Sequence, residues 1–209
     1  MRKLIAAFLS FILGACATPD VASDYKIDRE SKQGVVTGSV SYVGRPSGYR
    51  VYFRQIPGGY SGSFGTGAAS TLLPFSEKGD FNDQHGLGTV FAAALPPGEY
   101  EIFSWAVASG YANVRSTVPF SIRFTVEPGK LVYLGNFQFR QTAGLGLTVT
   151  GATVSYREAI ARDIPVFKRK FPGLSETPIA YAVEAGMNRS DLGGQSATIM
   201  TIPIFLPVR

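Results

Sequence analysis

Alternation of apolar and polar residues, interrupted by glycine- and proline-rich turns, is the feature that most limits the folds open to this chain. The stretch 118–126 is the clearest case, because every second residue from Phe120 to Val126 is apolar. A period of two is typical of a strand with one face on a hydrophobic core. The pattern predicts strands at 35–43, 49–56, 88–95, 100–107, 118–126, 131–139 and 145–156.

The alternation also predicts which residues share a face of each strand. The first strand should place Val36, Gly38, Val40 and Tyr42 on one face, and the strand at 131–139 should group Leu131, Tyr133, Gly135, Phe137 and Phe139. The stretch 100–107 is largely apolar on both faces, which indicates a central strand.

The composition agrees with a fold that is mostly β. Glycine is abundant, at 24 of 209 residues, while charged residues make up only 17% of the chain. The stretch 156–171 changes to a helical pattern that ends at Pro172-Gly173, with Asp163 expected to cap a short turn. We therefore expect an antiparallel β-sandwich of the Ig-like or prealbumin-like kind, with a short C-terminal helical segment.

The first residues have the pattern of an export signal. Arg2 and Lys3 precede an apolar stretch, residues 4–13, that is too short to cross a bilayer. Leu13-Gly14-Ala15-Cys16 then matches a lipobox, in which small residues precede the cysteine that receives the lipid (a diacylglyceryl group on sulfur, with palmitate-type acyl chains). Cys16 is the only cysteine of the chain, so a hydrophobic core rather than an internal disulfide must stabilise the mature protein.

These signals predict four segments: a lipoprotein signal peptide at 1–15, a lipidated flexible tether at 16–33, a β-sandwich at 34–156, and a helical segment with a tail that packs on the sandwich at 157–209. Ala17 follows the cysteine where an aspartate would favour retention in the inner membrane. The predicted location is therefore the outer membrane, on either its periplasmic side or its surface.

Two turns carry a resemblance to known proteins. The sequence LPPGEYEI at 95–102 resembles a hairpin of transthyretin-like and carboxypeptidase-regulatory-like sandwich domains. The sequence FTVEPGKLVYLG at 124–135 resembles a hairpin of uncharacterised bacterial envelope lipoproteins with such a domain. The resemblance covers roughly residues 35–140. It implies a sandwich topology and transfers no catalytic residue.

The segment 57–87 interrupts the strand pattern, and long loops in compact domains are often functional. Its glycine-rich first half and polar second half make it a possible ligand-contact loop, with the candidate residues Tyr60, Phe64, Asp80, Asp83 and His85. No catalytic residue is assigned, because no nucleophile motif frames a serine near the single histidine. The Asx-rich turn at 80–83 lacks the spacing of a calcium loop, so neither a metal site nor another cofactor is predicted.

The predicted function is that of a lipid-anchored envelope protein that acts as a non-enzymatic binding or assembly module. The expected partners are the membrane, through the anchor, and envelope proteins or glycan. Removal of residues 1–15 lowers the formal charge from +5 to +3, and basic residues are scattered apart from Lys168-Arg169-Lys170, so nucleic acid is not expected. The alternatives are a carbohydrate- or peptidoglycan-binding lipoprotein and, with less support, a hydrolase that uses His85.

Overall fold

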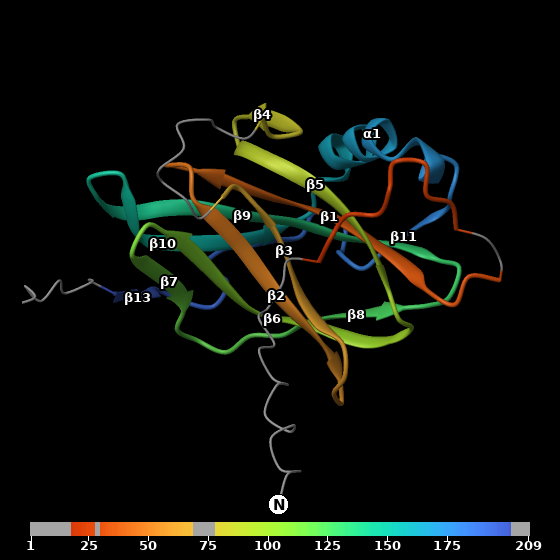
Figure 1. Ribbon diagram of the computed structural model, residues 1–209, viewed down its shortest axis with the longest axis horizontal. Helices are drawn as coiled ribbons and strands as arrows, with labels where there is room; N and C mark the ends of the chain where they lie inside the picture. The colour runs from red at the N-terminus through yellow and green to blue at the C-terminus, as the bar shows by residue number, and fades with distance from the viewer. Residues whose placement is uncertain (1–17, 28–29, 69–77, 202–209) are drawn as a thin grey trace, which may run out of the picture.

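The chain folds into two β-sheets packed face to face, with one helix outside them (Figure 1). The computed structural model describes residues 18–27, 30–68 and 78–201, so the predicted signal peptide and the predicted lipidation site Cys16 lie outside the described residues. The prediction of a mostly-β sandwich with a short helix is confirmed. None of the helices in the described part is long and apolar enough to span a membrane.

The six-stranded sheet has the order β13-β7-β6-β2-β3, with β8 also paired to β6. Its strands are β2 (Gly48–Ile56), β3 (Ser61–Thr66), β6 (Gly98–Ser109), β7 (Ala112–Ser116), β8 (Ile122–Val126) and β13 (Ser196–Met200). The segment 57–87 was predicted as one loop, but its first part contains β3, which pairs with β2. The strand β7 was not predicted.

The seven-stranded sheet has the order β12-β10-β9-β1-β5-β4, with β11 also paired to β9. Its strands are β1 (Gly34–Val43), β4 (Phe81–Asp83), β5 (Gly86–Leu95), β9 (Leu131–Leu145), β10 (Thr148–Arg157), β11 (Ile179–Tyr181) and β12 (Asn188–Arg189). The pair β1–β9 is parallel, whereas β1 and β5 are antiparallel.

Aromatic and β-branched side chains fill the space between the sheets. Val36, Val40 and Tyr42 of β1 point into this core, as the alternation predicts. The ring of Phe64 stacks on that of Phe91 from the opposite sheet, with their centroids 4.1 Å apart. Burial of each such side chain contributes about 2 kcal/mol, so this core replaces the disulfides that a single cysteine cannot form.

The central strand β6 has apolar residues at both odd and even positions because it contains an irregularity that keeps them on one face. Its pairing with β2 shifts register between Tyr52 and Phe53, which leaves Phe103 as an extra residue. Tyr100 and Ile102 therefore enter the core before the shift, and Trp105 enters it afterwards.

Both turns that carry the family resemblance join the two sheets. The turn after β5 leads to β6 in the opposite sheet, and the turn after β8 leads to β9 in the opposite sheet. The expectation of hairpins at these turns is therefore wrong, because the two strands that each turn joins pair in different sheets.

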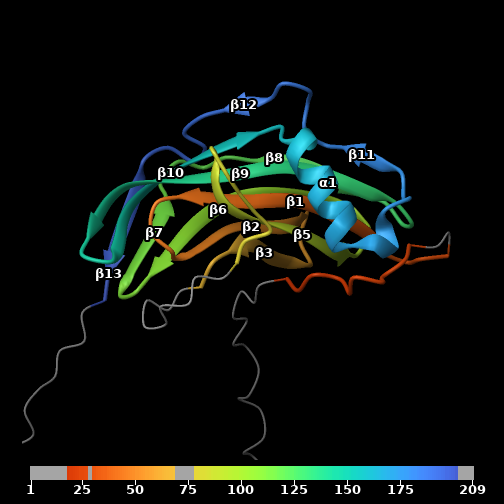
Figure 2. The ribbon, with the colours of Figure 1, turned by 90° about the horizontal axis from the view of Figure 1, so that it is seen from above.

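The helix α1 (Ile160–Lys170) lies on the outer face of the seven-stranded sheet and is followed by a 3-10 turn at Pro172–Leu174 (Figure 2). Phe167, Phe171 and Leu174 pack on Val35 and Leu131 of the sheet in a second apolar cluster. Asp163 lies in the first turn of α1 and does not cap it. That prediction is wrong because its carboxylate points to the sheet instead.

Residues 18–27 form a strap along the margin of the sandwich, drawn in red in Figure 2. Thr18 N donates to Ser63 O on β3 at 3.0 Å, and Val21 N donates to Ala92 O on β5 at 2.8 Å. Val21, Tyr25 and Ile27 pack against the second apolar cluster. This part of the predicted tether is therefore held on the domain and is not a free linker.

The strap helps to close the open edge of β5 in an arrangement that we call the edge clamp, formed by Asp20, Asp80 and Lys170. Lys170 Nζ lies 3.2 Å from Asp20 Oδ2 and 2.8 Å from Asp80 Oδ2. Asp20 accepts from Ala92 N, Asp80 accepts from Val90 N, and Lys170 donates to Val90 O. The clamp satisfies backbone groups of β5 that an unprotected edge would offer to another chain.

Replacement of Lys170 by methionine should lower the free energy of unfolding by about 2 kcal/mol, because two carboxylates and a carbonyl lose a charged donor. Urea unfolding followed by circular dichroism measures this change. Lys168→Met is the matched control, since Lys168 is exposed on the same helix. Equal losses in the two variants would contradict a stabilising role for the clamp.

Candidate functional site

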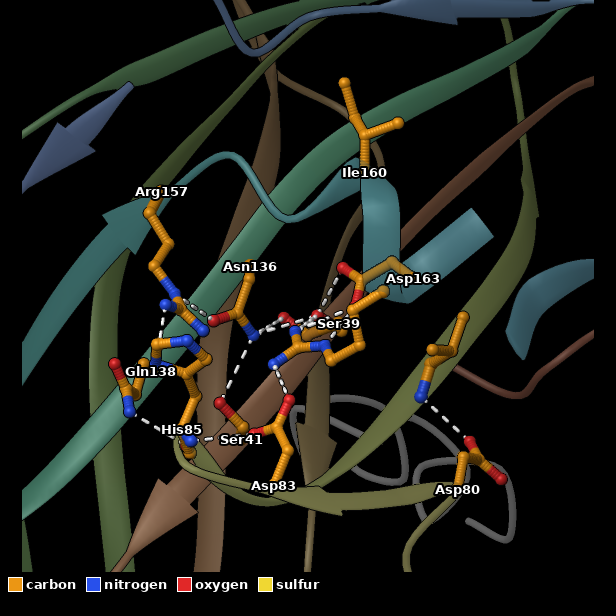
Figure 3. A network of polar contacts seen from close by, with 12 residues as sticks. Ser39, Ser41, Asp80, Asp83, His85, Asn136, Gln138, Arg157, Ile160 and Asp163 are labelled. Atoms are coloured by element: carbon orange, nitrogen blue, oxygen red, sulfur yellow. Dashed lines mark hydrogen bonds and ion pairs between the residues drawn. The ribbon is translucent and has the colours of Figure 1, made fainter. Parts of the chain in front are cut away.

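Polar side chains gather beneath α1 on the outer face of the seven-stranded sheet (Figure 3). Ser39 and Ser41 come from β1, and Asn136 comes from the neighbouring β9. Asn136 Nδ2 donates to Ser39 Oγ at 2.8 Å and to Ser41 Oγ at 3.3 Å. All three residues are buried. Two central strands therefore carry a buried polar patch, although buried side chains on central strands are usually apolar.

A bulge in β9 places Asn136 in this patch. Thr37 pairs with Tyr133, but the next pair on the same face is Ser39 with Asn136, so β9 contains one extra residue. Gly135 lies in the bulge with φ 92°, and a Cβ there would meet Arg157 O at 2.9 Å. The expectation that residues 131–139 keep one alternation throughout is therefore wrong.

The carboxylate of Asp163 is the centre of the network. Asp163 is fully buried and its Oδ2 accepts from Ser39 Oγ at 2.6 Å and from Tyr133 Oη at 2.7 Å. Its Oδ1 accepts from Nε and Nη2 of Arg162, both at 2.8 Å. Burial, followed by the negative charge of Asp163, raises the pKa of Tyr133, so this hydroxyl stays a donor.

Two arginines bind the same polar patch from opposite sides. Arg162 Nη2 donates to Ser39 Oγ at 3.0 Å, and its guanidinium lies over the ring of Phe81. Arg157 Nε donates to Asn136 Oδ1 at 3.0 Å. Arg162 is paired with Asp163 and lies 3.5 Å from Asp83, whereas no ion pair involves Arg157 among the described residues.

One nitrogen of each guanidinium, Arg157 Nη2 and Arg162 Nη1, is buried without a hydrogen-bond partner among the described residues. Arg162 Nη1 faces Asp83 Oδ2 at 3.5 Å, within the range of an ion pair. The two arginines are nevertheless balanced by the carboxylates of Asp83 and Asp163. The two positive charges are therefore matched by two negative charges within the network. The contacts of the network fix α1 and the β4–β5 hairpin on the sheet.

His85 closes the outer side of the network (Figure 3). Its Nδ1 lies 2.8 Å from Arg157 Nη1, and its Nε2 lies 3.2 Å from Gln84 Nε2. Partial burial, and then the positive charge of Arg157, holds the pKa of His85 below its ordinary value. Among the described residues, the ring nitrogens of His85 thus contact Arg157 and Gln84, whereas a Ser-His-Asp hydrolase requires a serine and a carboxylate there.

The predicted ligand-contact residues do not form one group. Asp83 and His85 belong to the network beneath α1, and Asp80 belongs to the edge clamp. Tyr60 lies in the β2–β3 turn, 39% exposed, with its ring near that of Phe53. Phe64 is buried in the sandwich core, so its prediction as a ligand contact is wrong: it fills space between the sheets.

Within the described residues, no three His, Cys, Asp or Glu side chains lie together as ligands of a metal ion. Asp80 and Asp83 are close in sequence, but their carboxylates serve different partners: Asp80 accepts from Val90 N, and Asp83 accepts from His85 N. The polar turn that contains them is accounted for by these bonds.

The sequence analysis missed the residues that hold the network together: Ser39, Asn136, Arg157, Arg162 and Tyr133. One signal was present, because Thr37, Ser39 and Ser41 alternate with apolar residues in a strand that also pairs on both sides. A polar face on a central strand requires a polar cover, and here α1 and the β4–β5 hairpin supply it.

Comparisons with known proteins add little to this description. No family model matches the chain, and no curated protein matches it. Among solved structures, it is similar to a leucine-rich repeat protein from Bacteroides thetaiotaomicron VPI-5482, with 20% identity and a TM-score of 0.28. The match covers 51% of this chain and 14% of that protein, and a likeness of this size carries no argument about fold or function.

Replacement of Asp163 by asparagine should lower the free energy of unfolding by about 3 kcal/mol, because the buried guanidinium of Arg162 loses its main counter-charge. Urea unfolding of the chain without residues 1–16 measures the effect. Asp24→Asn makes the same chemical change at an exposed position and should leave stability almost unaltered. An unchanged urea midpoint in Asp163→Asn would show that the network does not hold the helix.

Proposed function

We propose that this protein is a lipid-anchored component of the bacterial envelope whose β-sandwich acts as a non-enzymatic binding or assembly module at the outer membrane. The observation that carries the proposal is the tetrapeptide Leu13-Gly14-Ala15-Cys16 at the end of a short basic and apolar signal. Two or three acyl chains on such a cysteine bind a membrane firmly, since each buried CH₂ contributes about 0.8 kcal/mol.

The geometry of the polar network supports a module without catalysis. Ser39 is fully buried and receives hydrogen bonds from Asn136 and Arg162, so it is a poor nucleophile. The ring of His85 contacts Arg157, and this positive charge disfavours the imidazolium that His85 would form if it accepted a proton as a general base. A hydrolase based on His85 therefore has little support.

The alternative of a carbohydrate- or peptidoglycan-binding lipoprotein relies on Tyr60 and Phe64 as the aromatic residues that would contact the sugar or peptide. Phe64 belongs to the core, and only Tyr60 of that pair remains at the surface. A single exposed tyrosine is ordinary on a protein surface, so no observation favours glycan over protein as the partner.

Replacement of Cys16 by serine should abolish acylation, because the thiol is the atom that receives the lipid. Mass spectrometry of the membrane fraction should find an acylated N-terminal Cys16 in the unaltered protein, which should partition into a detergent phase. Ala17→Ser, which keeps the thiol, is the matched control and should stay acylated. An unmodified chain that begins elsewhere would refute the anchor.

Replacement of Ala17 by aspartate should move the protein from the outer to the inner membrane in a host that sorts lipoproteins by the residue after the cysteine. Separation of the two membranes on a sucrose gradient measures the shift, and Ala17→Ser again serves as the control. Inner-membrane location of the unaltered protein would contradict the proposed address while leaving the anchor intact.

A further inference from the structure

The chain between the predicted lipid and the folded domain is very short. Thr18 is already hydrogen-bonded to Ser63 of β3, an edge strand of the six-stranded sheet. Only Ala17 lies between Cys16 and Thr18, and two extended residue steps span about 7 Å. A lipid on Cys16 would therefore hold this edge of the sandwich next to the headgroups of the bilayer.

The outer face of the six-stranded sheet carries two rows of arginines. In one row, Arg50 of β2 and Arg115 of β7 both pair with Ala106 of β6. In the other row, Arg54 and Arg123 both pair with Glu101. The helix α1 packs on the opposite sheet, and no other helix of the described residues covers this arginine face.

The arginine face has an excess of positive charge that reaches solvent. Among the residues that the structure describes, the acidic side chains of these strands on this face are Glu99, which accepts from Thr125, and Glu101, which is nearly buried between Arg54 and Ser121. The side chain of Arg54 is 56% exposed and lies over the ring of Phe103. Such a surface complements the negative potential of anionic phospholipids, which attracts arginine and lysine close to the membrane.

We infer that the domain lies on its own membrane with the arginine face against anionic lipid headgroups, and with α1 directed away from the bilayer. The inference rests on the proposed lipid anchor. Two independent observations point to the same side of the molecule: the strap leaves the sandwich at the edge of this sheet, and the arginines lie on its uncovered face.

The test uses the mature acylated protein in vesicles of phosphatidylethanolamine and phosphatidylglycerol. The sulfur of an acylated Cys16 is a thioether, so a second cysteine can be labelled alone with a fluorophore. Thr125→Cys places the label on the arginine face, and Tyr181→Cys places it on the opposite layer, where Tyr181 is 52% exposed. A nitroxide on the lipid headgroup should quench the first label several-fold more strongly than the second.

The outcomes separate the two proposals. Failure of the protein to float with the vesicles would overturn the anchor itself. Flotation with equal quenching of both labels, or with stronger quenching at Tyr181→Cys, would overturn the orientation while the anchor stands.

A pair of charge variants tests the role of the arginines. Arg50→Gln with Arg115→Gln should reduce quenching of the Thr125→Cys label on anionic vesicles, with an unchanged circular dichroism spectrum. Lys168→Gln with Arg169→Gln removes the same charge from α1 and should not alter it. Equal effects of the two double variants, or none from the first, would overturn recognition of lipid by the arginine face.

Discussion

The buried carboxylate of Asp163 is the interaction on which the arrangement of the outer layer depends. It receives hydrogen bonds from β1, from β9 and from Arg162 of its own helix, so one side chain joins three elements. A buried carboxylate is costly unless its oxygens accept hydrogen bonds, and both oxygens of Asp163 do so. The polar face of β1 follows from the same need, because an apolar residue in place of Ser39 would leave the carboxylate short of a donor.

Irregularities in two strands decide which residues meet at these interfaces. The bulge at Gly135 turns Asn136 toward Ser39, and without it the next outward residue of β9 would be Gly135, which has no side chain. The shift near Phe103 lets β6 place Tyr100 and Trp105 in the same core although their spacing is odd. Both devices move side chains between faces at the cost of one unpaired residue.

The sequence alone predicts those parts of the fold that depend on the local alternation or periodicity of apolar residues. The core face of β1, the central place of β6 and the short helix all follow from local patterns. The network beneath α1 could not be predicted, because Asp163 and Ser39 are far apart in the chain and their contact depends on how the helix docks. Bulges are equally hidden, since an extra residue leaves the composition of a strand unchanged. The turns at 96–98 and 127–130 were recognised as turns, but their sequence does not state which sheet the next strand joins.

The strap is occupied by contacts along the sandwich, which limits how much of the N-terminal segment could act as a tether to the proposed lipid anchor. The edge of β5 beyond β4 offers backbone groups at Val90 and Ala92, and the edge clamp together with Val21 N occupies them. A segment near the N-terminus that shields an edge must lie along it, and so cannot also serve as free spacer. The same ten residues that protect the edge therefore leave no free spacer on the domain side of Thr18, and under the proposed anchor a longer tether would have to be inserted before Thr18.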